Sequence, residues 1–175
     1  MEALSDKELV ERSRSGDTAA YSTLVHRYQR PVCAATTAVL GDFHTAQDAA
    51  QDAFLVAYER LGALRNPSAF GAWLLRIARR EAIGYVRKRQ REEALKKATP
   101  PDPRRNGKLD ETSEALLAAV ARLPEHEFQV VALHYLDGHS VQEVADHTER
   151  PVGTVTKQLQ RARTRLRRIL KRIDL

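Results

Sequence analysis

The feature of this sequence that most constrains its fold is a short helix, a polar break and a longer helix near the end of the chain. Residues 140–147 have the spacing of the short helix, residues 148–150 form the break, and residues 151–168 have the spacing of the longer helix. Apolar residues of the longer helix recur at i, i+4, i+7 and i+11, namely Val155, Leu159, Ala162 and Leu166. That stripe is expected to face a core while the opposite face stays polar. The pattern predicts a helix-turn-helix unit.

The longer helix is also strongly basic. Between Lys157 and Arg172 there are eight Lys or Arg residues and no acidic residue, and the whole chain has a net charge of +6. A long basic helix held at a fixed angle by a shorter one is the arrangement with which proteins enter the major groove of DNA. Lys and Arg bind phosphates or guanine, and Gln pairs with adenine. The residues predicted to contact DNA are Thr154, Thr156, Lys157, Gln158, Gln160, Arg161 and Arg163, with Thr164 beside them.

Helical periodicity dominates the rest of the chain. Ser-x-x-Glu capping boxes at residues 5–8 and 140–143 predict the first turns of two helices. Pro31 should bend or interrupt a helix, because proline has no amide hydrogen and its ring clashes with the preceding turn. We predict an all-α protein. Besides the helix-turn-helix, the expected helices cover residues 5–15, a segment containing residues 21–28, and residues 45–61, 68–91, 113–123 and 125–136.

A Pro-rich segment divides the chain. Residues 96–108 contain three prolines and no large apolar side chain. Such a segment cannot bury enough apolar surface to order itself, so a flexible linker is predicted over residues 92–112. The prediction is therefore of two small helical domains, the first over residues 1–91 and the second over residues 113–175.

The helix expected at residues 45–61 has an acidic face in a chain of net positive charge. Asp48, Gln51, Asp52 and Glu59 lie opposite the apolar stripe of this helix. DNA would repel that face, whereas a protein with a basic surface would attract it. The helix expected at residues 68–91 is instead basic in its distal half. The chain thus carries two basic surfaces and one acidic surface on separate elements.

The order of these parts resembles the bacterial RNA polymerase sigma factors of the extracytoplasmic-function (ECF) group, in the sigma-70 superfamily. Ser5 to Val10 followed by Gly16-Asp17 looks like the opening of that family. Further along, residues 48–58 (DAAQDAFLVAY) are similar to its region 2.2, residues 70–79 (FGAWLLRIAR) to region 2.3 running into 2.4, residues 123–138 to region 4.1, and Val144-Ala145 with residues 151–155 (PVGTV) to region 4.2. Five motifs in family order on both sides of a linker make this a specific resemblance.

The resemblance implies a transcription initiation factor that binds core RNA polymerase, recognises the −10 and −35 elements of promoter DNA and assists promoter opening, without catalysis or a cofactor. The basic helix near the end would read the −35 element. The basic residues after Arg163 would either contact phosphates, or contribute only to solubility or to polymerase contact. The expected protein partners are the β′ coiled coil and the β flap of the polymerase, and an anti-sigma factor. The residues implied in polymerase binding are Asp48, Gln51, Asp52 and Tyr58.

The family region that captures the −10 element corresponds to the basic helix of the first domain. Binding an unpaired strand requires cations for the backbone and a pocket or stacking surface for a base. The residues that could supply these are Arg76, Arg79, Arg80, Tyr85, Arg87 and Lys88. Trp73 could also stack on a base, but its place on the apolar stripe favours the core. This chain differs from the family pattern at four positions. The family often has Asn where Arg80 stands, Asp where Gly84 stands, and a basic residue where Thr156 and Gln158 stand. We therefore expect this chain to prefer bases that differ from those of its relatives.

Other functions find little support in the sequence. The six histidines show no metal-ligand spacing, no Gly-rich phosphate loop is present, and Cys33 lies among small apolar residues. The first residues lack the apolar stretch of a signal peptide, and no membrane insertion is expected, so a location in the bacterial cytoplasm is predicted. A stand-alone helix-turn-helix regulator is the alternative, but it leaves the acidic helix unexplained. A nuclease would require a carboxylate cluster for its metal ion, and none is apparent.

Overall fold

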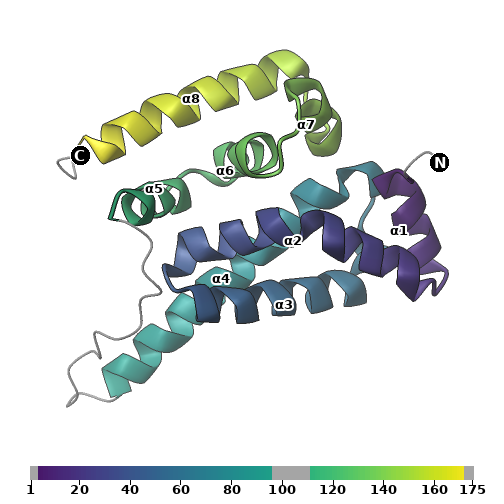
Figure 1. Ribbon diagram of the computed structural model, residues 1–175, viewed down its shortest axis with the longest axis horizontal. Coiled ribbons are helices and arrows are strands. Elements are labelled where there is room, and N and C mark those ends of the chain that lie inside the picture. Colours follow the sequence, from purple (N-terminus) through teal and green to yellow (C-terminus); the bar gives the residue numbers. More distant parts are fainter. Residues whose placement is uncertain (1–3, 96–110, 172–175) are drawn as a thin grey trace.

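The structure is a computed structural model that describes residues 4–95 and 111–171, and these residues form helices and no strands (Figure 1). The predicted all-α fold is therefore confirmed. The first half contains α1 (Asp6–Arg14), α2 (Thr18–Leu40), α3 (Phe43–Glu59) and α4 (Phe70–Leu95), with the short turns η1 (Leu61–Ala63) and η2 (Pro67–Ala69) before α4. The second half contains α5 (Glu111–Ala121), α6 (Glu125–Val131) with the wide turn η3 (Ala132–Leu136), α7 (Val141–Thr148) and α8 (Val152–Leu170).

Side-chain caps explain where the first helices begin. The Ser5 amide donates to Glu8 Oε2 at 2.8 Å and the Glu8 amide donates to Ser5 Oγ at 3.3 Å, which confirms the first predicted capping box. Asp17 caps α2 and Asp42 caps α3 by accepting a backbone hydrogen bond within the first turn. Gly41 ends α2 with φ at 67°, a conformation that glycine adopts without steric cost.

Helices α2, α3 and α4 pack together as the body of the first half, with α1 across one end of α2. The backbone of α4 comes so close to α2 at Gly71 that an added Cβ would lie 2.6 Å from Cε1 of Tyr28. Pro31 is buried, and α2 continues through it as one helix from Thr18 to Leu40. Of the two predicted outcomes, a bend or an interruption, the interruption does not occur, because buried residues on both sides of the proline hold the two parts of the helix in register. The bend stays a prediction.

The second half contains the predicted helix-turn-helix. Ser140 and Glu143 form the second capping box at the start of α7. Glu149 ends α7 in the left-handed conformation (φ 53°), the single non-glycine residue with positive φ in the described ranges. The predicted stripe of α8 is confirmed, because Val155, Leu159 and Ala162 are buried. Leu166 is half-buried against the same core.

The two halves pack directly against each other through one continuous apolar core. Helix α5 lies along α2, and α6 and α7 contact α4, so the second half covers one side of the first (Figure 1). The linker predicted over residues 92–112 falls mostly outside the described residues, and its described ends belong to α4 and α5. The domain boundaries stay a prediction.

Candidate nucleic-acid and protein interfaces

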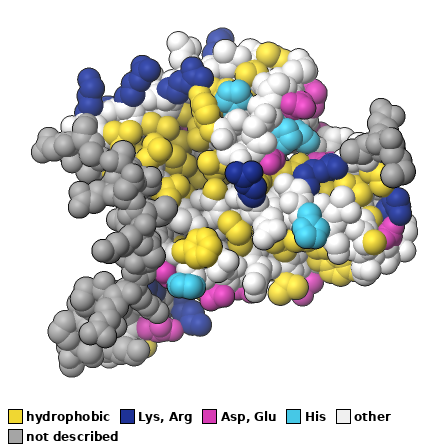
Figure 2. Space-filling model, in the orientation of Figure 1, with side chains coloured by type: hydrophobic (Ala, Val, Ile, Leu, Met, Phe, Trp, Pro, Cys, Tyr) yellow, Lys and Arg dark blue, Asp and Glu magenta, His cyan; other side chains and the backbone are white. Residues whose placement is uncertain are grey.

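The polar face of α8 is the first candidate interface, and most of it is accessible. Among the residues predicted to contact DNA, the exposed ones are Thr156, Lys157, Gln160, Arg161 and Arg163, and the half-buried ones are Thr154 and Gln158. Figure 2 shows Lys and Arg side chains in a row along the upper edge of the molecule, where α8 lies. Because α8 contains no acidic residue, this edge attracts an anionic partner.

Thr156 and Gln158 are already engaged within the protein. The hydroxyl group of Thr156 donates to the carbonyl oxygen of Val152 at 2.9 Å, one helical turn earlier. The amide oxygen of Gln158 accepts a hydrogen bond of 3.2 Å from the guanidinium group of Arg150, in the turn before α8. These two side chains are therefore less available for base contacts than their positions on the helix suggest.

The other predicted residues of α8 differ in how they are held. Arg163 donates from Nε to the hydroxyl oxygen of Tyr135 at 2.6 Å, and its guanidinium carbon lies 5.7 Å from the centre of that ring. Within the described ranges, the side chains of Lys157, Gln160 and Arg161 form no hydrogen bond or ion pair with the protein. Together they line a shallow hollow on the surface of α8. These three side chains therefore form an open polar surface on α8.

Arg150 is a structural residue that the sequence analysis missed. It donates to the side-chain oxygen of Gln129 at 2.9 Å and to the carbonyl oxygen of His126 at 3.3 Å, as well as to Gln158. Burial lowers the pKa of its guanidinium group. Arg150 thereby ties the turn of the helix-turn-helix to α6. Its partners lie up to 24 residues away, so no local pattern could have identified it.

The basic surface of α4 contains only part of the residues predicted for it. Arg76, Arg80, Arg87 and Lys88 are exposed, whereas Arg79 and Tyr85 are half-buried. Ile83, an apolar residue of the same helix, is 36% exposed.

Arg79 points into the second half of the molecule. Its Nη2 donates to the carbonyl oxygens of Ala121 at 2.9 Å and Leu123 at 2.6 Å, and its Nη1 lies 3.2 Å from Oε2 of Glu125. The guanidinium group also lies 4.6 Å from the ring centre of Phe128. All four partners belong to α6 or to the end of α5 and the segment that joins them. Arg79 therefore connects the two halves of the molecule.

Tyr85 points toward α3. Its hydroxyl group donates to Oδ2 of Asp52 at 2.6 Å. This hydrogen bond, burial and the charges of Asp52, Asp48 and Glu81 raise the pKa of Tyr85 to about 12. A residue predicted to touch DNA and a residue predicted to touch the polymerase are thus joined to each other.

The outer face of α3 combines charge with an exposed apolar side chain. Asp48 and Gln51 are exposed, Tyr58 is 40% exposed, and Leu55 is 63% exposed between them. The Tyr58 ring lies 4.7 Å from the ring of Tyr21. Leu55 was not among the predicted site residues. The sequence could have identified it, because an apolar residue outside the apolar stripe of a helix is expected to be exposed. A surface of this composition suits a protein partner.

A polar cavity of ≈ 470 Å³ lies between the two halves. The first half contributes the loop before α4 together with Trp73 and Arg76, and the second half contributes Gln129 and residues 147–150. Arg14 holds that loop by donating to the carbonyl oxygens of Leu61 and Leu64. Trp73 is half-buried and packs against the core, in agreement with the preference stated above, while it also lines the cavity.

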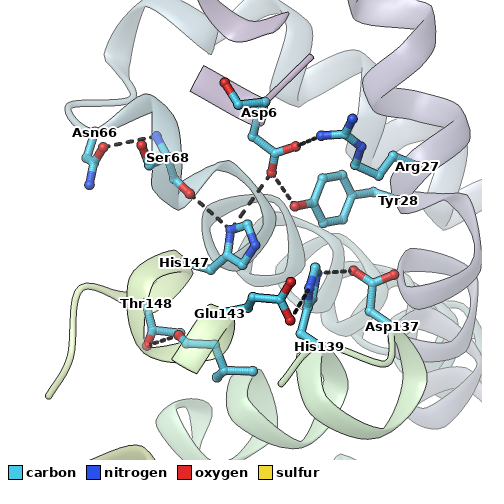
Figure 3. Close-up of polar contacts among 12 residues, drawn as sticks. Asp6, Arg27, Tyr28, Asn66, Ser68, Asp137, His139, Glu143, His147 and Thr148 are labelled. Carbon is cyan, nitrogen blue, oxygen red and sulfur yellow. Dashed lines mark hydrogen bonds and ion pairs between the residues drawn. The ribbon is translucent and has the colours of Figure 1, made fainter. Parts of the chain in front are cut away.

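A second polar cluster joins α1 and α2 to α7 (Figure 3). The buried carboxylate of Asp6 accepts hydrogen bonds from Arg27 and from the Tyr28 hydroxyl group. On the other side, Nδ1 of His147 lies 3.9 Å from Asp6 Oδ2 and donates to the carbonyl oxygen of Ser68 at 3.1 Å. The cluster therefore places a charged pair of the first half against a histidine of the second.

His139 lies next to this cluster. Its Nε2 is 2.8 Å from Oδ2 of Asp137, and its ring centre is 4.6 Å from that of His147. The short contact of His139 Nε2 with the Asp137 carboxylate, which favours the protonated ring, is the main reason that the pKa of His139 is raised, and the charges of Asp137, Glu143 and Asp6 act in the same direction against burial. Throughout residues 4–95 and 111–171, no group of His, Cys, Asp and Glu side chains is arranged to hold a metal ion.

The fold and these surfaces define a helical DNA-binding protein of the helix-turn-helix class with an additional helical domain. Comparison with known proteins narrows that class. Residues 24–92 match the family model "Sigma-70 region 2", and residues 113–166 match the model "Sigma-70, region 4". The chain is 33% identical over 173 residues to the RNA polymerase sigma-H factor of Pseudomonas aeruginosa, covering 90% of each chain. It is 34% identical over 182 residues to the ECF RNA polymerase sigma-E factor of Escherichia coli K12, covering 93% of this chain and 92% of the relative.

The chain therefore belongs to the sigma-70 family of RNA polymerase sigma factors, in the ECF group. Its fold is also that of CnrH, solved in complex with the cytosolic domain of CnrY, with a TM-score of 0.60 and 24% identity over 95% of this chain and 97% of CnrH. The predicted function as a promoter-recognition factor in transcription initiation is confirmed, and the match to region 2 speaks against the stand-alone regulator. No helix in the described part of the chain is both long and apolar enough to cross a membrane.

Proposed function

We propose that this sigma factor divides promoter recognition among three surfaces: α8 for the −35 element, α4 for the −10 element, and α3 for core polymerase. The observation that carries the proposal is the separation of these surfaces. Exposed basic residues gather on the distal half of α4 and along α8, whereas α3 carries the exposed acids Asp48 and Glu59 next to the exposed apolar side chains Leu55 and Tyr58. Each surface thus suits a different partner, which is what a factor that links DNA to an enzyme requires.

On α8 the base contacts come from Lys157, Gln160 and Arg161, because these side chains are exposed and without a partner in the described structure. Gln158 holds the turn through Arg150, the Thr156 hydroxyl is bonded within α8, and Arg163 contacts the phosphate backbone from a position set by Tyr135. The half-buried Thr154 lies at the edge of this surface. Direct contacts to base edges select the sequence, whereas phosphate contacts set the register. This division concentrates the sequence choice on three neighbouring side chains.

On α4 the exposed cations Arg76, Arg80, Arg87 and Lys88 bind the backbone of the −10 strand. On α3, Asp48, Gln51, Leu55 and Tyr58 dock on the β′ coiled coil, with Asp52 held by Tyr85. The second domain contacts the β flap. An anti-sigma factor is a further partner, the protein acts in the bacterial cytoplasm, and it performs no covalent chemistry of its own.

The proposal is tested by run-off transcription with purified core polymerase and fragments of the genome of the source bacterium. We expect promoter-specific transcripts that depend on the factor. The charge reversals Asp48→Lys and Arg80→Glu should separate the roles, because the first should abolish co-purification with core polymerase and the second should abolish only promoter opening. Absence of a specific transcript together with absence of polymerase binding would contradict the proposal.

A further inference from the structure

We propose that Glu127 on α6 is a positioning residue for promoter reading, which acts by holding Arg165 on α8 in place. The inference rests on the proposed role of α8 in reading the −35 element. It goes beyond that role because it assigns control of the base choice to a buried residue of another helix. The pair fixes the orientation of α8 and neutralises one cation of its surface.

The carboxylate of Glu127 is buried, with 2% of its side chain exposed. It accepts hydrogen bonds from Nε of Arg165 at 3.0 Å and from Nη2 of the same residue at 3.4 Å, so the guanidinium group is held at two points. A buried charge is costly unless it is paired, and a two-point contact between Arg and a carboxylate has a defined geometry. Glu127 also lies in the first turn of α6, where the helix dipole favours a negative charge. The pair therefore fixes one point of α8 on α6.

A second point of α8 is fixed two helical turns earlier. Arg150 donates to the side-chain oxygen of Gln158 on α8 at 3.2 Å and to that of Gln129 on α6 at 2.9 Å. Because Gln158 and Arg165 are seven residues apart, they lie on one side of α8, about 10 Å apart along its axis. Arg161, one of the residues proposed to contact bases, lies between them in the sequence. The two anchors on α6 thus enclose part of the proposed reading surface.

The apolar stripe of α8 defines the orientation of the helix less precisely. Its buried members are Val155, Leu159 and Ala162. Apolar contacts have no preferred direction, whereas a binding site needs its groups held to within about 0.5 Å. Hydrogen bonds do have a preferred direction, so the two polar anchors on α6 supply that precision. Loss of the Glu127 charge should therefore reduce the base discrimination by Gln160 and Arg161.

The same pair reduces the attraction of α8 for DNA in general. Arg165 is 38% exposed and borders the hollow on the surface of α8. The other residues that line this hollow are Lys157, Gln160, Arg161, Thr164 and Arg168. Because Glu127 already neutralises its charge, Arg165 adds little to the attraction of phosphates, and phosphate contacts increase affinity without choosing a sequence. The pair thus lowers non-specific binding while it orients the helix that selects bases.

The test uses the full-length factor, alone and assembled with core polymerase. Glu127→Gln keeps the shape of the side chain and an oxygen that accepts from Arg165, but it removes the charge. Glu11→Gln, on the exposed side of α1, is the matched control for the lost charge. Binding of the free factor to a random DNA duplex is measured at several salt concentrations, and binding of holoenzyme is measured on promoter fragments with single −35 substitutions. Circular dichroism confirms that each variant is folded.

Relative to the control, Glu127→Gln should raise the affinity of the free factor for the random duplex about three-fold. It should also steepen the dependence of log Kd on log salt by up to about 0.9, the value for one added phosphate contact. In holoenzyme the same variant should reduce the preference for the best −35 sequence about five-fold. A merely structural role of Glu127 would lower both affinities together, so a rise in one and a fall in the other identify positioning.

Arg165→Lys is the second variant, since it keeps the charge pair but loses the two-point contact. It should reduce the −35 preference without changing the salt dependence, whereas Arg167→Lys at an exposed position of α8 should change neither. An unchanged −35 preference in both Glu127→Gln and Arg165→Lys, or a fall of both affinities in Glu127→Gln, would overturn the proposal. Gln160→Ala on the same promoter fragments tests the reading role of α8 separately, because the salt dependence of Glu127→Gln is measured on random DNA.

Discussion

The hydroxyl group of Tyr85 on α4 donates a hydrogen bond of 2.6 Å to the carboxylate of Asp52 on α3. The bond joins a helix proposed to hold promoter DNA to the helix proposed to dock on polymerase. It also orients Asp52, which is half-buried, relative to the exposed Asp48. A change at Tyr85 should therefore be felt on the polymerase-binding face.

Tyr85→Phe is expected to lower the free energy of unfolding by about 0.5–1.5 kcal/mol, as is usual for loss of one hydrogen bond, and to weaken binding to core polymerase. Urea denaturation and a polymerase-binding titration measure the two effects. Tyr135→Phe is the matched control, since its hydroxyl group lies on the other half of the molecule. In the wild type, NMR of ¹³Cζ-labelled tyrosine should give Tyr85 a pKa of about 12, and Asp52→Asn should bring it back toward 10. A pKa of Tyr85 that stays the same in Asp52→Asn would show that Asp52 does not cause the rise.

Leu55→Asp is expected to weaken binding to core polymerase at least ten-fold while leaving the free energy of unfolding nearly unchanged. The side chain is 63% exposed, so its loss removes little from the core of the free protein. Leu95→Asp, at a position that is 85% exposed near the end of α4, is the control. Equal polymerase affinities of the two variants would remove Leu55 from the proposed docking face.

Stability should fall as the pH rises through the pKa of His139. That pKa is raised above 6.5 in the folded protein, mainly by the short contact of the ring with the Asp137 carboxylate. As the pH rises, the unfolded chain therefore loses this proton before the folded protein does. The stabilisation of the folded protein by protonated His139 is complete below pH 6.5 and disappears as the pH passes the folded-state pKa. Urea denaturation at pH 6 and at pH 8.5 measures the difference. His139→Asn should flatten that part of the profile, and a variant profile parallel to that of the wild type would assign the effect to other groups.

Gly71→Ala should destabilise the protein by about 1–3 kcal/mol, because the new methyl group would meet the buried Tyr28 ring at 2.6 Å. Gly84→Ala on the same helix is the control. Its Cβ would meet nothing within 4 Å, so the better helix propensity of alanine should stabilise the protein by about 0.5–1 kcal/mol. Urea denaturation of both variants gives the two signs, and a neutral Gly71→Ala would mean that α2 and α4 can move apart without cost.

Gln160→Ala should change the base preference of the holoenzyme at one position of the −35 element, with a loss of discrimination of about 1–3 kcal/mol. Arg167→Ala, which removes a cation further along α8, should weaken binding about equally for all sequences and reduce its salt dependence. Binding of holoenzyme to a set of promoters with single −35 substitutions measures both. A uniform loss with Gln160→Ala would place that residue among the phosphate contacts.

Local patterns predicted the helices well, because their causes are local. Both capping boxes and the stripe of α8 depend on residues within a few turns of one another, and they form as expected. Pro31 shows where this reasoning ends. The local cost of a proline in a helix was correctly identified, but packing of α2 against its neighbours decides whether the helix continues.

The sequence by itself determined an all-α sigma factor with a basic reading helix, since caps, helical periodicity and family motifs are all written in contiguous segments. Only the tertiary structure decided what Arg79 and Tyr85 do. Arg79 meets acceptors 42 to 46 residues away and Tyr85 meets a carboxylate 33 residues away. A charged or hydroxyl side chain can pair with any of many partners along the chain. Only the packing of the helices brings one of those partners within hydrogen-bonding distance.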